Sequence, residues 1–325
     1  VVSAFLLFLI QPMVAKMVVP RLGGVPAIWN TCLVFFQAAL LAAYAYVHLV
    51  TARWPNRRYA TWHVLLLALP LLTFPLEIPS GWVPPAEASP IPWFLWALTI
   101  TIGLPFFVVA TTAPLIQRWV ADTSHPAAQD PYFLYAASNL GSLLALLTYP
   151  VLIEPHFSLI TQRRLWMAGY GLFALLVCGC AVALRRSAPA SAPSLDRLRP
   201  DSETDRPTAV DRIRWIALSF APSSLLLGVT TYISTDLAAV PLLWLIPLTL
   251  YLLTCVLVFA QRAPLPHPWM VRALHLTVLP VVILMASGVE GPAWLLPLHL
   301  LFFFVAAMAC HGTLAARRPS ARHLT

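Results

Sequence analysis

The chain is built from apolar runs of roughly helix-spanning length, separated by short polar stretches. A membrane-spanning α-helix needs about 20 apolar residues. The runs cover residues 1–19, 28–50, 61–74, 93–111, 131–153, 165–184, 213–231, 240–260, 268–287 and 293–315. This pattern predicts an all-α fold, a polytopic transmembrane helix bundle of about ten spans. The third run is short and ends in prolines, Pro70 and Pro75, so it is the weakest of the predicted spans.

Composition supports the same class. Hydrophobic residues make up 60% of the chain and charged residues only 10%. A soluble domain carries about 25% charged residues, and a disordered chain has low hydrophobicity. Water-soluble globular proteins and disordered proteins are therefore both excluded, and the lipid bilayer is the first expected partner.

The basic residues predict an orientation. The chain carries 20 basic and 12 acidic residues, a net charge of +8. If the N-terminal side of the first span is cytoplasmic, 16 of the 20 basic residues fall on the cytoplasmic side. The four on the other side are Lys16, Arg21, Arg163 and Arg164. Cytoplasmic loops of membrane proteins carry such an excess. The charge therefore indicates loops that face anionic lipid, and no nucleic-acid partner is expected.

One polar stretch divides the chain. Residues 185–214 hold 12 of the 32 charged residues together with four prolines. Such a stretch does not bury enough apolar surface to fold by itself. We therefore predict a six-helix membrane unit over residues 1–184, a flexible Arg/Pro-rich cytoplasmic linker over 185–212, and a four-helix membrane unit over 213–325. Because residue 1 already lies inside an apolar run, we expect a chain truncated at both ends.

Three groups of polar residues are candidate binding sites, and each has a structural alternative. The first group is Gln11, Lys16 and Asn30, around the Gly23-Gly24 turn. A lysine within a membrane segment is costly and is a functional candidate by default. Alternatively, Lys16 reaches the headgroups from near the helix end, and the glycines only make a tight turn.

The second group is Gln117, Tyr135 and Asn139, which could line a polar pocket. The alternative is helix–helix packing, because small and polar residues let membrane helices approach and hydrogen-bond. The third candidate is Asp236, at the outer end of a span. It could bind a cation or an amine at a helix break, or it could cap the helix that follows.

Catalytic and cofactor motifs are not found in the sequence. The chain has no HExxH, CxxC, GxGxxG, GxxxxGK[ST] or GxSxG pattern. We therefore predict no catalytic residue, no metal site and no cofactor. The five cysteines are interpreted as apolar packing residues. Histidines at positions 48, 63, 275, 299 and 311 lie in or near spans, without the spacing of a metal site.

Several stretches together resemble a known family. They are residues 8–16 (FLIQPMVAK), 23–32 (GGVPAIWNTC), 35–37, 111–119, 130–143, 153–155, 222–250 and 310–325. The chain resembles the membrane region of bacterial spermidine-synthase-like proteins, also described as fused transporter-like/spermidine synthases. The resemblance implies a multi-pass protein of the bacterial inner membrane. It also implies a soluble aminopropyltransferase-like domain after the membrane region, which would bind decarboxylated S-adenosylmethionine and a diamine.

Three functions follow as hypotheses. The first is a membrane domain that anchors or feeds a soluble catalytic domain absent from this chain; spermidine synthase activity is then implied by resemblance only. The second is a small-molecule transporter for an amine or organic ion, with a site near Lys16, Asn139 and Asp236. The third is an accessory structural subunit that packs against other membrane subunits.

Overall fold

The structure, a computed structural model, describes residues 1–23, 26–54, 56–85, 88–121, 123, 133–186, 208–233, 245–260, 264–287 and 295–317. These residues form helices and no extended strand, which confirms the predicted all-α class. Within them, eight helical stretches are long and apolar enough to cross a membrane. The stretches are Val2–Leu22, Thr31–Arg53, Pro90–Ala121, Phe133–His156, Leu159–Arg186, Ala209–Tyr232, His267–Ala286 and Leu296–Ala316. The chain is therefore a multi-pass membrane protein.

Two further predicted spans are shorter in the structure. The helix α11 (Leu245–Phe259) is apolar but has 15 residues within the described part of the chain. The third run forms α3 (Asn56–Leu66) and the 3-10 helix η1 (Leu69–Thr73). Because Pro70 lacks an N–H group and fixes its φ, the chain tightens into the 3-10 turn there instead of continuing α3.

Two of the long stretches contain π-helical turns. The stretch Pro90–Ala121 consists of α4 (Pro90–Leu98), η2 (Thr99–Gly103), α5 (Leu104–Ala110) and α6 (Thr112–Ala121). The other stretch consists of α7 (Phe133–Thr148), η4 (Tyr149–Ile153) and α8 (Glu154–His156). Pro105 and Pro150 lie in or beside the π turns, and proline interrupts the regular hydrogen-bond ladder of a helix.

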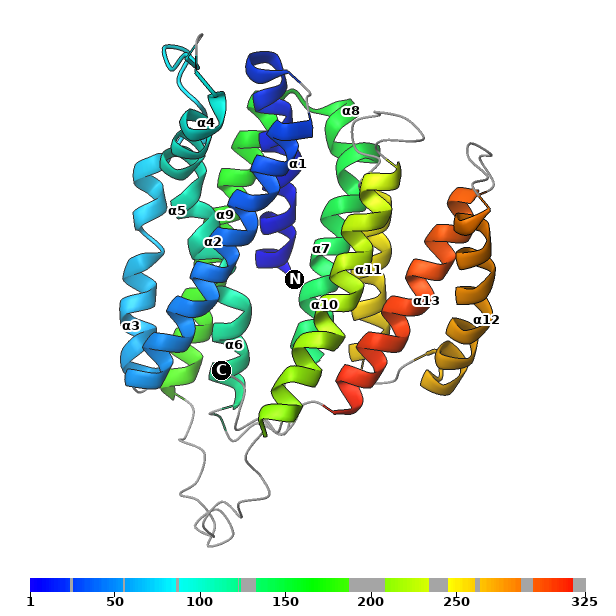
Figure 1. Cartoon of the computed structure of the whole chain (residues 1–325). Coiled ribbons are helices and arrows are strands. Elements are labelled where there is room, and N and C mark those ends of the chain that lie inside the picture. Colours follow the sequence, from blue (N-terminus) through cyan, green and yellow to red (C-terminus); the bar gives the residue numbers. More distant parts are fainter. Residues whose placement is uncertain are drawn as a thin grey trace, which may run out of the picture. The chain divides into compact units, whose positions relative to one another are not determined.

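The helices form two compact units. The first unit holds α1 (Val2–Leu22), α2 (Pro26–Arg53), α3 to α6, the end of α7 from Leu144, η4, α8 and α9 (Leu159–Arg186). The second holds α7 up to Leu143, α10 (Ala209–Tyr232), α11, α12 (His267–Ala286) and α13 (Leu295–Ala316). The sequence-based division places all of α7 in the first unit, whereas the structure groups its first part with the second. Figure 1 shows the elements in chain order.

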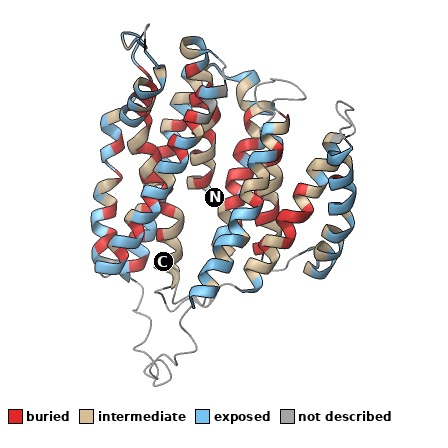
Figure 2. Ribbon diagram, viewed as in Figure 1, coloured by how far each residue is buried: buried red, intermediate tan, exposed pale blue. Residues whose placement is uncertain are grey.

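In the first unit, α1 packs against α9 through an aromatic core. Trp166 donates its indole N–H to the carbonyl oxygen of Leu6 at 2.9 Å, and Tyr170 donates to the carbonyl oxygen of Leu67 at 2.9 Å. Both rings are fully buried and stack with centroids 5.8 Å apart. Gly169 lets the helices approach, since a Cβ there would lie 2.9 Å from Leu6 Cδ2. Figure 2 shows the buried residues of each unit in red.

In the second unit, α13 is the central helix and packs against α10, α11 and α12. Residues 305–309 of α13 are buried without interruption. The helix α12 is the opposite case, because Val281 is its one buried residue. In a membrane protein such exposed apolar surface is expected to face lipid.

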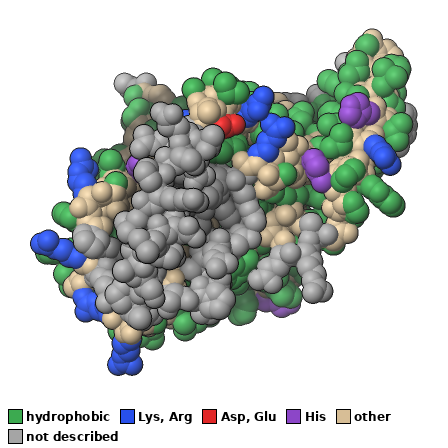
Figure 3. All heavy atoms as spheres, turned by 90° about the horizontal axis from the view of Figure 1, so that it is seen from below, with side chains coloured by type: hydrophobic (Ala, Val, Ile, Leu, Met, Phe, Trp, Pro, Cys, Tyr) green, Lys and Arg blue, Asp and Glu red, His purple; other side chains and the backbone are tan. Residues whose placement is uncertain are grey.

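The basic residues of the first unit are distributed between its two ends. Arg185, at the end of α9, donates to the Thr61 hydroxyl in the middle of α3. This end also carries Arg53 and Arg58. Figure 3 looks onto the corresponding face, where Lys and Arg side chains are spread among the residues drawn in colour.

At the opposite end of the first unit, the basic side chains are tied to specific partners. Arg163 forms an ion pair with Glu77. Arg21 donates to the carbonyl oxygens of Ile78 at 2.7 Å and Pro79 at 3.0 Å. Three of the four basic residues predicted for the outer side, namely Lys16, Arg21 and Arg163, thus have oxygen partners.

Candidate functional site

The structure places Lys16 in an ion pair. Its Nζ atom lies 3.5 Å from Glu154 Oε1, and the two side chains are 38% and 35% exposed. Gln11 lies on the same helix, α1, and is partly buried. The charge of Lys16 is therefore balanced within the first unit by Glu154, which follows the π turn of η4.

The structure says less about three other candidate residues, Gln117, Asn30 and Asp236. Gln117 is partly buried in α6 and is described with the first unit, separately from Tyr135 and Asn139. Asn30 lies in α2, but its side chain is outside the described residues. Asp236 is also outside the described residues.

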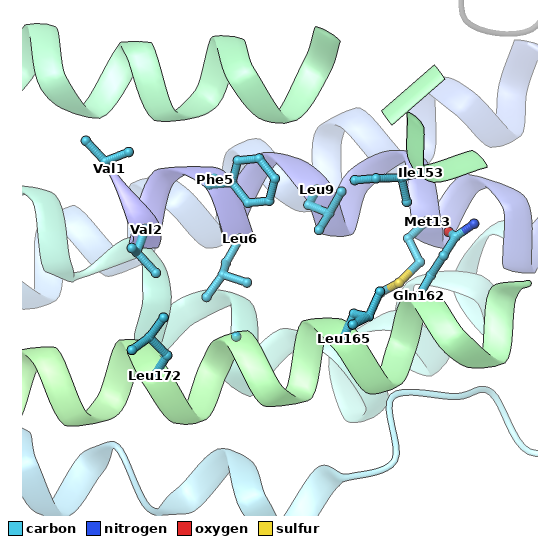
Figure 4. A pocket seen from close by; sticks show the side chains of 11 residues that line it. Val1, Val2, Phe5, Leu6, Leu9, Met13, Ile153, Gln162, Leu165 and Leu172 are labelled. Atoms are coloured by element: carbon cyan, nitrogen blue, oxygen red, sulfur yellow. The ribbon is translucent and has the colours of Figure 1, made fainter. Parts of the chain in front are cut away.

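A pocket in the first unit is apolar. It has a volume of about 370 Å³ and is lined by side chains of α1, η4 and α9, including Phe5, Leu9 and Leu172. Gln162 is its polar lining residue, and both ends of that side chain are bonded: Tyr149 Oη donates to Oε1, and Nε2 donates to the carbonyl oxygen of Phe157. Figure 4 shows the apolar side chains around this space. Neither Gln11 nor Lys16 lines it, so it is not the predicted polar site.

In the second unit, Tyr135 and Asn139 have different roles. Asn139 is buried, and its side-chain amide donates to the Tyr135 carbonyl oxygen of its own helix at 2.8 Å. Tyr135 points toward α11: its hydroxyl lies 4.0 Å from Cys255 Sγ, and its ring packs edge-on against Phe259. Tyr135 of α7 therefore contacts a polar cluster that the sequence analysis does not predict.

This cluster, which we call the His311 cluster, joins four helices of the second unit. Its members are Tyr135 of α7, Ser223 of α10, Tyr251, Thr254 and Cys255 of α11, and His311 of α13. Thr254, Cys255 and His311 are at most 3% exposed. Polar and ionisable side chains buried within membrane segments are rare and commonly functional.

His311 lies at the centre of the cluster. Its Nδ1 atom is 2.9 Å from Thr254 Oγ1 and 3.7 Å from Cys255 Sγ. The Thr254 hydroxyl also donates to the Tyr251 carbonyl oxygen at 2.6 Å. One imidazole nitrogen thus meets a hydroxyl and a thiol that neighbouring positions of α11 supply.

Tyr251 extends the cluster toward α10. Its ring packs edge-on against the His311 ring, with centroids 5.0 Å apart and an interplanar angle of 84°. Its hydroxyl lies 3.4 Å from Ser223 Oγ. Ser223 follows Pro222, which interrupts the backbone ladder of α10.

The His311 cluster lies near one end of the second unit. His311 is five residues before the end of α13 at Ala316, and Thr254 is five residues before the end of α11 at Phe259. At a rise of about 1.5 Å per residue, both lie roughly 8 Å inside their helix ends. The Trp215 indole N–H donates to the Arg317 carbonyl oxygen at 2.9 Å, so α10 begins at this same end.

A second histidine of the same unit contacts α13 two positions after His311. His267 Nε2, at the start of α12, lies 3.4 Å from Thr313 Oγ1. The ring also covers Gly312, where a Cβ would lie 2.3 Å from His267 Nδ1. Gly312 is therefore required for the close approach of this ring to α13.

The first unit has a smaller histidine cluster of its own. His63 of α3 is fully buried, with Nδ1 3.5 Å from the Tyr59 hydroxyl and its ring perpendicular to that of Trp119. His63 Nε2 and Trp119 Nε1 are buried without a hydrogen-bond partner among the described residues. The ring centroids of His63 and Trp119 are 6.3 Å apart.

Sequence reasoning missed the His311 cluster because its members come from separate segments. It noted His311 as a histidine near a span and interpreted Cys255 as a packing residue. Thr254 and His311 are 57 residues apart, so no local spacing links them. The available signal was the presence of an ionisable residue within an apolar run.

The chemistry open to the His311 cluster is hydrogen bonding and proton binding. In the part of the chain that the structure describes, no group of three or more His, Cys, Asp or Glu side chains could hold a metal ion. In comparisons with known proteins, no family model matches the chain and no curated protein matches it.

Proposed function

We propose that this chain is the membrane module of a spermidine-synthase-like protein and that it carries a small polar solute, a diamine or polyamine, across the membrane toward a soluble catalytic domain. The observation that supports this proposal is the His311 cluster. It places hydrogen-bonded imidazole, thiol and hydroxyl groups between four membrane helices. Such groups are expected where a solute or a proton passes.

The size of the bundle supports transport over anchoring alone. One apolar helix is sufficient to hold a domain at a membrane in an effectively irreversible way. This chain has eight helical stretches of spanning length in its described part, two of them with π turns. π turns are frequent at functional sites, since they widen a helix and release backbone groups locally.

The proposed location is the inner membrane of a bacterium, with the N-terminal side of α1 in the cytoplasm. The charge pattern supports this orientation. The end of the first unit with Arg53, Arg58 and Arg185 is the proposed cytoplasmic end. In the same orientation α13 ends on the cytoplasmic side, where the family resemblance implies a soluble domain. The His311 cluster then lies close to the place where that domain would receive a solute.

Two alternatives share part of this support. A stand-alone transporter for an amine or organic ion would use the same cluster without a catalytic domain. An accessory subunit of a larger membrane complex would use the exposed faces of α10 and α12 instead. One experiment distinguishes transport from an anchor and from an accessory subunit.

The experiment uses the 325-residue chain, purified and reconstituted into lipid vesicles. Uptake of radiolabelled putrescine and spermidine is measured for the unaltered chain, for His311→Gln, and for the control Thr277→Val. Thr277 lies on α12 and donates only to carbonyl oxygens of its own helix, so its loss should leave transport intact. We expect saturable uptake by the unaltered chain and the control, and background uptake by His311→Gln.

Uptake equal to that of empty vesicles, with protein that is monodisperse before reconstitution, would overturn the transport proposal and leave an anchor. Co-purification of a stoichiometric membrane partner together with absent uptake would favour the accessory subunit. Uptake that is unchanged in His311→Gln would separate transport from the His311 cluster and remove the observation that supports it.

A further inference from the structure

The hydrogen bonds of Thr254 determine which nitrogen of His311 carries a proton. A threonine hydroxyl has a single hydrogen to donate. Thr254 Oγ1 lies 2.6 Å from the Tyr251 carbonyl oxygen, which can only accept, so the hydroxyl hydrogen is used there. The 2.9 Å contact between Thr254 Oγ1 and His311 Nδ1 is then a bond that the imidazole donates. His311 therefore carries its hydrogen on Nδ1.

This assignment leaves Nε2 as the basic nitrogen. In a neutral imidazole one nitrogen donates and the other accepts. In the described part of the chain, the hydrogen bonds of His311 use Nδ1. Nε2 therefore carries a lone pair. The ring is held in place by the bond between Nδ1 and Thr254 and by the perpendicular ring of Tyr251.

We propose that Nε2 of His311 is a reversible proton-binding site within the second unit and that the proton is the coupling ion of the transport proposed above. The inference about coupling rests on that proposed function. On binding, a water-borne proton forms an N–H bond at Nε2 and the ring becomes an imidazolium; on release, the proton returns to water and the neutral Nδ1–H form is restored.

The surroundings of His311 suit a proton better than a metal or a permanent ion pair. The titratable or hydroxyl side chains of the cluster around it are Thr254, Tyr251 and Cys255 of α11, Tyr135 of α7 and Ser223 of α10. On α13 itself Cys310 precedes His311, and His267 of α12 contacts Thr313 two positions later. The ion pairs found between described residues, Lys16–Glu154 and Arg163–Glu77, both belong to the first unit. Among the described residues His311 has no acidic partner, so gain of a proton leaves a positive charge there.

That change in charge has a structural consequence. A buried imidazolium needs hydrogen-bond acceptors for both N–H groups, whereas the neutral ring needs one. Thr254 already serves Nδ1, so the new Nε2–H has to find water or a carbonyl oxygen. Pro222, beside Ser223 of the cluster, interrupts the backbone hydrogen bonds of α10 at this point.

The first test reads the two ring nitrogens directly. The chain is labelled with ¹⁵N-histidine and placed in lipid nanodiscs, and ¹⁵N spectra are recorded from pH 9 to pH 4. The chain holds nine histidines, and the difference from the His311→Gln spectrum assigns the His311 signals. We expect a protonated Nδ1 at high pH and a reversible gain of a proton by Nε2 on acidification.

A variant that keeps the histidine tests the role of Thr254. In Thr254→Val the hydroxyl is lost, and we expect the neutral form of His311 to become a mixture of both tautomers. The matched control Thr277→Val should keep the tautomer of the unaltered chain. An Nε2–H tautomer in the unaltered chain, or an Nε2 signal that stays unchanged across the whole pH range, would overturn the proton site.

A second measurement distinguishes proton binding and proton coupling at His311 from the transport of the solute itself. Vesicles that contain the chain and the pH dye pyranine are given putrescine, spermidine and an acidic outer buffer. Solute uptake accompanied by internal acidification, both lost in His311→Gln, supports proton coupling. Solute uptake without acidification overturns the coupling but not the transport. A titrating Nε2 with no uptake of either solute overturns the transport while upholding the proton site.

Discussion

The Thr254 hydroxyl and the His311 imidazole meet at 2.9 Å although 57 residues separate them in the chain. Thr254 comes from α11 and His311 from α13, and both residues are buried. The same two helices also meet where Cys255 Sγ and the Tyr251 ring contact the His311 ring. A buried imidazole N–H without an acceptor is costly, so this single contact contributes to both the stability and the chemistry of the second unit.

Replacement of Thr254 by valine should destabilise the second unit. Valine has nearly the same shape, but it removes the acceptor for His311 Nδ1. We expect a loss of about 1–3 kcal/mol in the free energy of unfolding, since a buried donor is left without a partner. Thermal unfolding of the detergent-solubilised chain measures the effect. Thr277→Val is the matched control, because that hydroxyl bonds only its own helix; equal losses in both variants would contradict the interpretation.

Gly312→Ala should weaken the packing of α12 on α13. The added Cβ would lie 2.3 Å from His267 Nδ1, so the ring has to leave its contact with Thr313. Overpacking of this kind costs about 1–3 kcal/mol. Gly228→Ala serves as the control, since a Cβ there meets nothing within 4 Å. A melting temperature that falls for Gly312→Ala and is maintained or raised for Gly228→Ala is the expected result.

Lys16→Met should have little effect on stability. The Lys16–Glu154 pair is more than one-third exposed on both sides, and pairs of this kind contribute about 0–1 kcal/mol. In the vesicle assay we also expect Lys16→Met to transport like the unaltered chain, because Lys16 is balanced by Glu154. A complete loss of uptake with normal folding would restore Lys16 as a solute-binding residue.

Arg21→Lys should loosen the segment after α3. The Arg21 guanidinium donates to the carbonyl oxygens of Ile78, Pro79 and Trp82, and a lysine ammonium does not reproduce this planar arrangement. We expect amide hydrogen exchange in residues 78–82 to become faster, with the rest of the first unit unaffected. Arg164→Lys, at an exposed position of α9, provides the comparison. Unchanged exchange in residues 78–82 would show that other contacts hold this segment.

The helical architecture could be predicted from the apolar runs because each run satisfies its own backbone hydrogen bonds within the membrane. The predicted runs near residues 1–19, 28–50 and 165–184 correspond to the helices α1, α2 and α9. The run over 61–74 was less predictable, because Pro70 divides it into α3 and the short 3-10 helix η1. The grouping of the first part of α7 with the second unit depends on packing that no local pattern encodes.

For the candidate residues, too, the sequence predicted which side chains are unusual but not which partners they contact. Lys16 stood out in the sequence as a charge in an apolar run, but the sequence did not reveal Glu154 as its partner, 138 positions later. Asn139 was a candidate either for lining a polar pocket or for helix–helix packing, and the sequence did not reveal that its amide donates to the Tyr135 carbonyl oxygen of its own helix. Thr254 was not singled out, because a threonine in an apolar run is unremarkable until its neighbours are known.

Hydropathy and the distribution of charge, both properties of the linear chain, determined the multi-pass helical class and the expected orientation. The free energy of transfer into lipid depends on each residue by itself, so these properties can be read from the linear sequence. The His311 cluster was decided only by tertiary structure, because α7, α10, α11 and α13 have to pack before their hydroxyl, thiol and imidazole groups meet. The tautomer of His311 depends on a bond that Thr254 makes elsewhere, and that relationship exists only in the folded second unit.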